Sequence, residues 1–140
     1  MKMGAEKEGQ ISAECLIVVG FIIFIIIGIL GVGLFYSNLI SDSIKMNHVR
    51  NFATKIISSS ESVFYSGEPS LATITVYLPS GVEDINIAGK EILFNVSTNT
   101  GLTKISFSSN VPLAGVLTKT EGVKRIRIAA SAGNVTISET

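Results

Sequence analysis

Few side chains in this sequence are of the types that carry out chemistry. His48 is the only histidine and Cys15 the only cysteine, so the chain has no His/Cys cluster for a metal and no internal disulfide. No nucleophile motif accompanies His48, which we expect to face solvent, and Cys15 lies in an apolar segment, where we expect a small buried hydrophobic residue. The glycine-containing turns match no phosphate-binding loop. We therefore predict no catalytic, cofactor-binding or metal-binding residue and no enzymatic activity.

The charges of the chain do not indicate a nucleic-acid partner. Eleven basic residues balance 11 acidic ones, so the formal net charge is zero. A small basic cluster is present at Lys124-Arg125-x-Arg127. Alternation with the apolar Ile126 and Ile128 predicts Arg125 and Arg127 on the solvated side of a strand, so we expect no nucleic acid to bind there.

Two asparagines stand in sequons for N-glycosylation. These are Asn95-Val96-Ser97 and Asn134-Val135-Thr136. Both asparagines alternate away from the apolar positions around them. Asn95 and Asn134 are therefore candidate glycosylation sites in a domain that leaves the cell.

The most prominent feature of the sequence is an apolar run of 22 residues, Cys15 to Tyr36, without a charged residue. A bilayer core of about 30 Å needs roughly 20 helical residues, so this run is long enough to span a membrane. It is also longer than the apolar core of an ordinary secretory signal, and no A-x-A cleavage site follows it. We predict a membrane-spanning helix over about residues 15–36.

The helical pattern continues beyond the apolar run. The spacing of Val49, Phe52, Ala53, Ile56 and Ile57 follows the i, i+3, i+4 rule of an amphipathic helix over about residues 38–65. The sequence Gly67-Glu68-Pro69 ends the pattern, because proline disfavours helical geometry in the residue before it. One long helix is therefore predicted over residues 10–66.

From residue 71 to the end, apolar residues recur with a period of two, which is typical of strands. Each strand-like run is bounded by a turn signal. The turn signals are Pro79-Ser80-Gly81, Ala88-Gly89, Asn99-Thr100-Gly101, Glu121-Gly122 and Gly133-Asn134. The pattern predicts a small antiparallel sheet or sandwich over residues 71–140, with the amphipathic half of the helix covering its apolar face. The fold class is therefore α+β.

A short motif directly precedes the apolar run. Gly9, Gln10, Ser12 and Glu14 form Gly-Gln-x-Ser-x-Glu, and this pattern resembles the class III signal peptide of archaeal type IV pilin-like proteins. The family often has a leucine four residues after the glutamate, where this chain has Val18. The plan of a polar leader, a long N-terminal helix and a β-rich head is also similar to that of archaeal pilins.

The resemblance implies a processing site and a role for each residue of the motif. Cleavage is expected between Gly9 and Gln10, which removes residues 1–9 as a leader. Gly9 has no side chain, so a class III prepilin peptidase can approach the scissile bond. Glu14 becomes the fifth residue of the mature chain and is expected to meet the N-terminal amine of Gln10 in a neighbouring subunit, because a carboxylate in an apolar environment is costly unless paired. A Gln10 that cyclises loses this charge, and Glu14 then needs another donor.

The resemblance further implies a structural subunit, as a major or minor pilin, of an archaeal type IV pilus-like surface filament with a role in adhesion. The expected partners are other copies of the chain, the prepilin peptidase, an assembly ATPase, a membrane platform protein and membrane lipid. The precursor is expected in the cell membrane with a cytoplasmic leader and an extracellular head, and the assembled form at the cell surface. The alternative is a permanent single-span membrane protein that displays a small β domain outside the cell.

Overall fold

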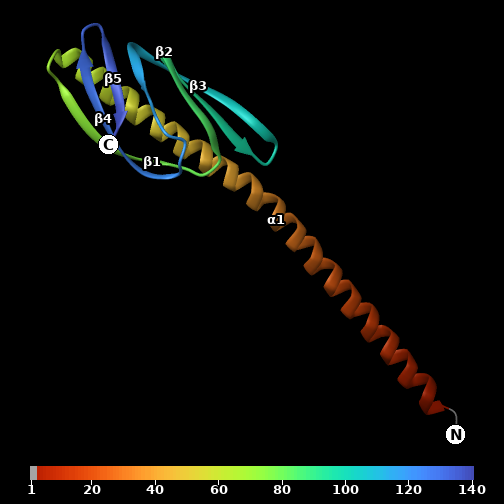
Figure 1. The fold of residues 1–140 in the computed structure, drawn as a ribbon. Coiled ribbons are helices and arrows are strands. Elements are labelled where there is room, and N and C mark those ends of the chain that lie inside the picture. The colour runs from red at the N-terminus through yellow and green to blue at the C-terminus, as the bar shows by residue number, and fades with distance from the viewer. Residues whose placement is uncertain (1–2) are drawn as a thin grey trace. The chain divides into compact units, whose positions relative to one another are not determined.

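The structure is a computed structural model that describes residues 3–140, with the side chains described from Ser12 onward. One helix, α1 (Met3–Ser66), precedes five strands (Figure 1). The strands are β1 (Leu71–Leu78), β2 (Val82–Thr98), β3 (Gly101–Val116), β4 (Gly122–Ser131) and β5 (Asn134–Glu139). This order confirms the predicted α+β class, a long N-terminal helix followed by a small and mostly antiparallel sheet.

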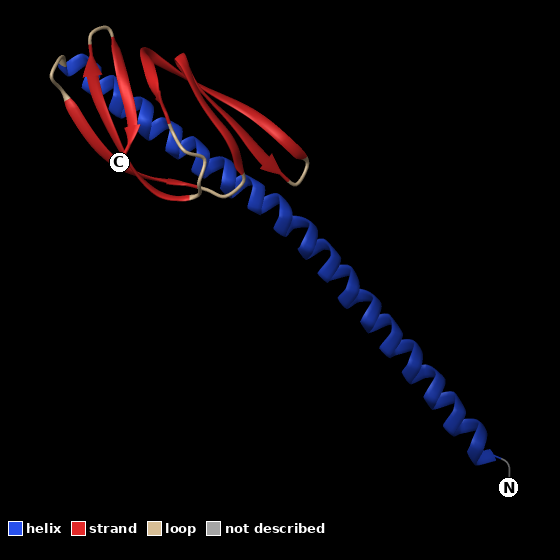
Figure 2. Cartoon of the chain, in the orientation of Figure 1, coloured by secondary structure: helices blue, strands red, loops and turns tan. Residues whose placement is uncertain are grey.

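Helix α1 is continuous over 64 residues and ends at Ser66 (Figure 2). Gly67 follows with a φ of 78°, and its N–H donates a hydrogen bond to the Phe64 carbonyl at 3.1 Å. A glycine in this left-handed conformation is the commonest way to satisfy the last carbonyls of a helix. The glycine of the predicted Gly67-Glu68-Pro69 stop therefore forms the C-terminal cap. At the other end, α1 already includes residues that we predicted to form the leader.

The five strands form one sheet in the order β1-β4-β5-β3-β2. All neighbouring pairs are antiparallel except β3 and β5, which run parallel over four residue pairs. The C-terminal strand β5 therefore lies between β4 and β3, and joins the β1/β4 pair to the β2/β3 pair. A single sheet decides between the two architectures, sheet and sandwich, that the strand pattern left open.

Strand β2 turns back on itself within its 17 residues. The Ser97 N–H donates to the Gly81 carbonyl at 2.7 Å, which brings the two ends of β2 together. An extended strand of this length would separate them by roughly 50 Å. Gly89 has a φ of 62° and lies where the sequence predicts the Ala88–Gly89 turn. The other predicted turn signals likewise contain glycines of positive φ, at Gly81, Gly101, Gly122 and Gly133.

The chain divides into two compact units, Met1–Ile40 and Ser41–Thr140. In the second unit, the C-terminal part of α1 packs on one face of the sheet, as the amphipathic pattern predicts. Phe52 meets Phe94 of β2 with ring centroids 5.9 Å apart, and Phe94 in turn meets Phe107 of β3 at 5.8 Å. Phe107 is half-buried, whereas the other two rings are buried. The fully buried apolar side chains of this core include Val49, Ala53, Ile56, Leu78, Ile92, Val96, Ile126, Ile128 and Val135.

The parallel contact between β3 and β5 is unusually close at one point. A Cβ atom added to Gly115 would lie 2.0 Å from the Ile137 carbonyl oxygen. Gly115 also has a φ of 151°, which side chains rarely adopt. Only glycine fits this position, and it allows β5 to pair with β3.

Candidate functional site

The processing motif lies in the N-terminal part of α1. Gly9 and Gln10 are helical in backbone, but their side chains lie outside the described part of the chain. Ser12 and Glu14 are exposed. The Glu14 carboxylate has no ion pair with any side chain described. The ion pair found among the described side chains lies in the β domain and joins Lys124 and Glu139.

The surface of α1 that follows the motif is apolar on every side. From Leu16 to Tyr36, 17 large apolar side chains are exposed in the isolated chain. Leaving an aliphatic or aromatic side chain in water rather than burying it costs about 1.5–3 kcal/mol, so this surface represents on the order of 25 kcal/mol or more. Cys15, which we expected to be buried, is exposed in the isolated chain as well. This segment therefore needs lipid or other protein around it.

Length and composition agree with that requirement. Residues Ser12–Ser66 form a helix long and apolar enough to cross a membrane, and its most apolar window is not buried inside the chain. A core helix of a soluble domain would be mostly buried. The described part of the chain therefore contains one candidate membrane span, which is followed by a small β domain.

Polar contacts hold the C-terminal part of α1 on the sheet. The Asp42 carboxylate accepts a hydrogen bond from the Asn99 N–H at 3.1 Å, in the turn between β2 and β3. The Glu61 carboxylate accepts from the N–H and the side-chain amide of Asn110 at 3.0 and 2.9 Å. The Lys55 ammonium donates to the Thr75 carbonyl of β1 at 3.3 Å. These hydrogen bonds set the position of α1 along its own axis relative to the sheet. The apolar contacts of the core cannot set that position alone, because they have no preferred direction.

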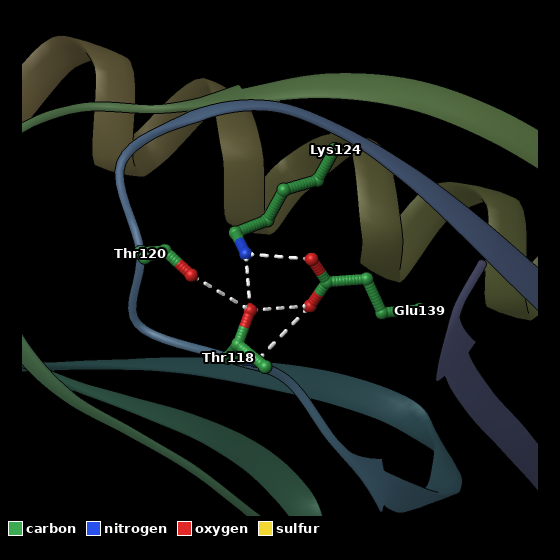
Figure 3. Close-up of polar contacts among 4 residues, drawn as sticks. All are labelled: Thr118, Thr120, Lys124 and Glu139. Atoms are coloured by element: carbon green, nitrogen blue, oxygen red, sulfur yellow. Dashed lines mark hydrogen bonds and ion pairs between the residues drawn. The ribbon is translucent and has the colours of Figure 1, made fainter.

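A buried charge in the head is held by a small polar network (Figure 3). The Lys124 ammonium of β4 donates to the Glu139 carboxylate of β5 at 2.8 Å, and their side chains are 4% and 27% exposed. Lys124 also donates to the Thr118 hydroxyl, and that hydroxyl donates to Glu139 at 2.7 Å. The Thr118 N–H also donates to the Glu139 carboxylate at 3.1 Å. The Thr120 hydroxyl donates to the Thr118 hydroxyl at 3.1 Å. The network joins β4, β5 and the loop between β3 and β4.

The network lowers the pKa of the Glu139 carboxyl below its ordinary value of 4.5. The hydrogen bond from Lys124 is the largest cause, followed by that from Thr118, and both favour the ionised form. Glu139 therefore stays charged to lower pH in the folded head than in an unfolded chain.

Lys124 was the residue that the sequence analysis missed. We placed only Arg125 and Arg127 on the solvated side of the strand and made no prediction for the side chain of Lys124. The structure separates the three residues: Lys124 is buried, and Arg125 and Arg127 are exposed. A signal was present, because Lys124 is in phase with Ile126 and Ile128 in the alternation of β4. The exposure of the arginines agrees with prediction.

The remaining sequence candidates lie apart from one another. His48 is exposed, as expected, and its ring contacts that of Tyr77 edge-on at 5.6 Å between centroids. Asn95 in β2 is half-buried and alternates with the buried Phe94 and Val96, so it faces away from the core. Asn134, at the start of β5, is also half-buried. The structure does not gather these residues into one site.

Comparisons of the chain with protein-family models, curated protein sequences and solved structures found no match. The class of protein therefore rests on the chain's own features. They define an α+β protein with one helix able to span a membrane and a small β domain, which is compatible with a single-span membrane protein.

Proposed function

We propose that this chain is the structural subunit of an archaeal type IV pilus-like surface filament. It is held in the membrane as a precursor, cleaved after Gly9 and assembled through its apolar helix. The observation that carries the proposal is the spacing of Gln10, Ser12 and Glu14 directly before the apolar run. That spacing resembles a class III signal peptide, and a spanning helix joined to a small β head is the arrangement such a subunit requires.

Gly9 suits a processing site in physical terms. The bond between Gly9 and Gln10 lies within α1, so a peptidase has to unwind the helix locally to reach it. Glycine in a helix interior is less stable than alanine by about 1 kcal/mol, which makes this opening easier. Its missing side chain also leaves both faces of the bond accessible.

Cleavage would change the charge at the start of the helix. In the uncut chain the nitrogen of Gln10 belongs to a neutral peptide bond, whereas after cleavage it is a free amine. Glu14 is four residues further along the helix and therefore lies on the same face as Gln10. The amine of one subunit can then pair with Glu14 of its neighbour, so cutting creates an ion-pair partner that the carboxylate does not have among the described side chains. This pairing gives a register to helices whose other side chains are nearly all aliphatic.

The exposed apolar surface of residues 16–36 suits both stages of such a life cycle. Lipid covers it in the precursor, and the same segments of other copies cover it in the filament core. Gly20, Gly28, Gly31 and Gly33 allow close approach between helices, as small residues do in membranes. The head would form the outer wall, where adhesion and glycosylation at Asn95 and Asn134 become relevant.

The second candidate is a permanent single-span membrane protein that displays the β domain outside the cell. The same spanning helix and compact head support it. The two functions differ in whether residues 1–9 are removed, because an uncut leader carries charges that prevent the helices from stacking flush.

A pair of glycine substitutions tests the proposal. Gly9→Val, expressed in place of the native copy, should leave uncut monomer in the membrane and abolish surface filaments. Gly4→Val is the matched control, because it adds the same side chain within the leader and away from the bond. Filaments at normal abundance in Gly9→Val cells would refute cleavage as the assembly step.

A further inference from the structure

A groove in the head lies between α1 and the outer strand of the sheet. Strand β1 is an edge strand, since it pairs only with β4 among the described strands, and the Lys55 side chain of α1 reaches its Thr75 carbonyl at 3.3 Å. The cavity at this contact has a volume of about 280 Å³. It is lined by four residues of α1, three of β1 and one of β4: His48, Asn51, Phe52, Lys55, Thr75, Val76, Tyr77 and Val123. Pockets for drug-sized ligands begin at about 300 Å³, so this one suits a single small ring of a larger molecule.

The groove combines an apolar floor with an aromatic wall. Phe52 and Val76 are buried and form the floor. Tyr77 is half-exposed, and its ring contacts that of His48 edge-on. An aromatic face of this kind offers a surface for the C–H groups of a saturated ring whose other substituents are polar.

Polar groups converge on the other end of the groove. Asn51, Lys55 and Thr75 supply an amide, an ammonium and a hydroxyl. The bond to the Thr75 carbonyl orients the Lys55 ammonium and uses one of its three donors, leaving two for a ligand. A second groove shares Asn51 and Lys55 and continues along α1 to Ser58, so a longer chain has room beyond the first ring.

The charge of the groove is positive and not neutralised. No carboxylate is among its lining residues in the described part of the chain. Arg125 is the cross-strand partner of Thr75, and cross-strand neighbours have Cβ atoms about 5 Å apart. Neither Lys55 nor Arg125 has an ion pair with a described residue. An anion in the groove would therefore meet a positive charge with no competing carboxylate among the lining residues.

From this geometry we propose that the groove binds an acidic polysaccharide through one carboxylate-bearing sugar ring. Tyr77 stacks on the ring, Asn51 and Thr75 hydrogen-bond its hydroxyls, and Lys55 pairs with its carboxylate. An acidic peptide shares the charge but presents no vicinal hydroxyls for the amide and hydroxyl to bind. Binding belongs to the single chain, so its failure is distinguishable from a failure of filament assembly.

The test uses the full chain in nanodiscs of zwitterionic lipid, titrated with tetragalacturonate and followed by calorimetry and by NMR. The matched ligand control is the same tetramer with its carboxyls methyl-esterified. We expect saturable binding of the acid, binding at least about tenfold weaker for the ester, and weakening by 0.5 M salt. Equal binding of acid and ester, equal binding of tetraglutamate, or no binding of the acid would each overturn the proposal.

Substitutions then locate the site. Lys55→Gln should weaken binding about tenfold, the usual effect of losing one charge-assisted hydrogen bond. Lys104→Gln is the matched control, because it removes the same charge from an exposed position on β3 and should change binding by less than about twofold. If Lys55→Gln does not fold, Asn51→Ala replaces it, since Asn51 is exposed and outside the core. Equal effects of the groove and control substitutions would place the binding elsewhere and overturn the assignment.

Discussion

The buried ion pair of the head gives a prediction whose size follows from the structure. Glu139→Gln keeps the shape of the side chain but removes the charge opposite Lys124, whose side chain is only 4% exposed. An uncompensated buried charge costs about 3–5 kcal/mol. The Glu139 side is 27% exposed and admits some water, so we expect a loss of about 2–4 kcal/mol in the free energy of unfolding of the head.

Removing the other partner of the ion pair should lower the free energy of unfolding by less. Lys124→Met keeps an apolar stem in the buried position and leaves the Glu139 carboxylate near solvent, still bonded to the N–H and hydroxyl of Thr118. We expect a cost of about 1 kcal/mol. The double variant should be destabilised by less than the sum of the two, because it contains no stranded charge.

Hydrogen exchange, measured by mass spectrometry on the full chain in detergent micelles, reports these differences as the opening free energy of amides in β4 and β5. Amides of residues 16–36 serve as the internal control, since they lie in the other compact unit. A change below about 0.5 kcal/mol for Glu139→Gln, or a larger cost for Lys124→Met than for Glu139→Gln, would refute the burial argument.

Four further predictions concern single groups. The pKa of Glu139 is lowered on folding, so its contribution to stability is present above pH 4.5 and lost as the pH falls through the folded value; the opening free energies of β4 and β5 should drop with acid in the native chain more steeply than in Glu139→Gln, and parallel profiles would contradict this. Gly115→Ala should cost at least about 3 kcal/mol in the same exchange experiment because its Cβ meets the Ile137 carbonyl, whereas Gly89→Ala, with nothing within 4 Å, should cost about 1–2 kcal/mol; equal costs would contradict the close approach. Ser60→Ala should raise the unfolding free energy by about 0.5–1.5 kcal/mol, because its buried hydroxyl has no hydrogen-bond partner among the described residues, while the exposed Ser58→Ala should change it little; a destabilised Ser60→Ala would reveal a missing partner. Under the proposed function, Glu14→Ala should leave membrane-bound monomer at normal levels and reduce filaments, because loss of the proposed pair with the amine of Gln10 would cost about 3–5 kcal/mol; Glu8→Ala of the leader is the control, and normal filaments would remove Glu14 from the mechanism.

The elements of the fold were predictable because each has a local signal. The change from a 3.6-residue to a two-residue period at Pro69 marks the end of the helix, and the turn glycines with positive φ coincide with the predicted turns. The arrangement of strands has no such signal. Nothing local indicates that β5 inserts between β4 and β3, or that Gly115 is needed for their contact, because both depend on residues far apart in sequence.

The candidate sites were predictable in part for the same reason. The Gln-x-Ser-x-Glu motif is local, so sequence alone identifies it. The partner of Lys124 is 15 residues away on another strand, and composition gives no reason to pair it with Glu139. The groove at Lys55 likewise joins residues of α1 and β1 that only the folded head brings together.

The most direct test of the proposed function is the N-terminus of the protein taken from cells that make it naturally. Intact-mass measurement of material sheared from the cell surface should find a chain that begins at Gln10, or at its cyclised form, and lacks residues 1–9. A chain that retains Met1 in the membrane fraction, with none recovered from the surface, would contradict the filament proposal and favour the permanent single-span protein.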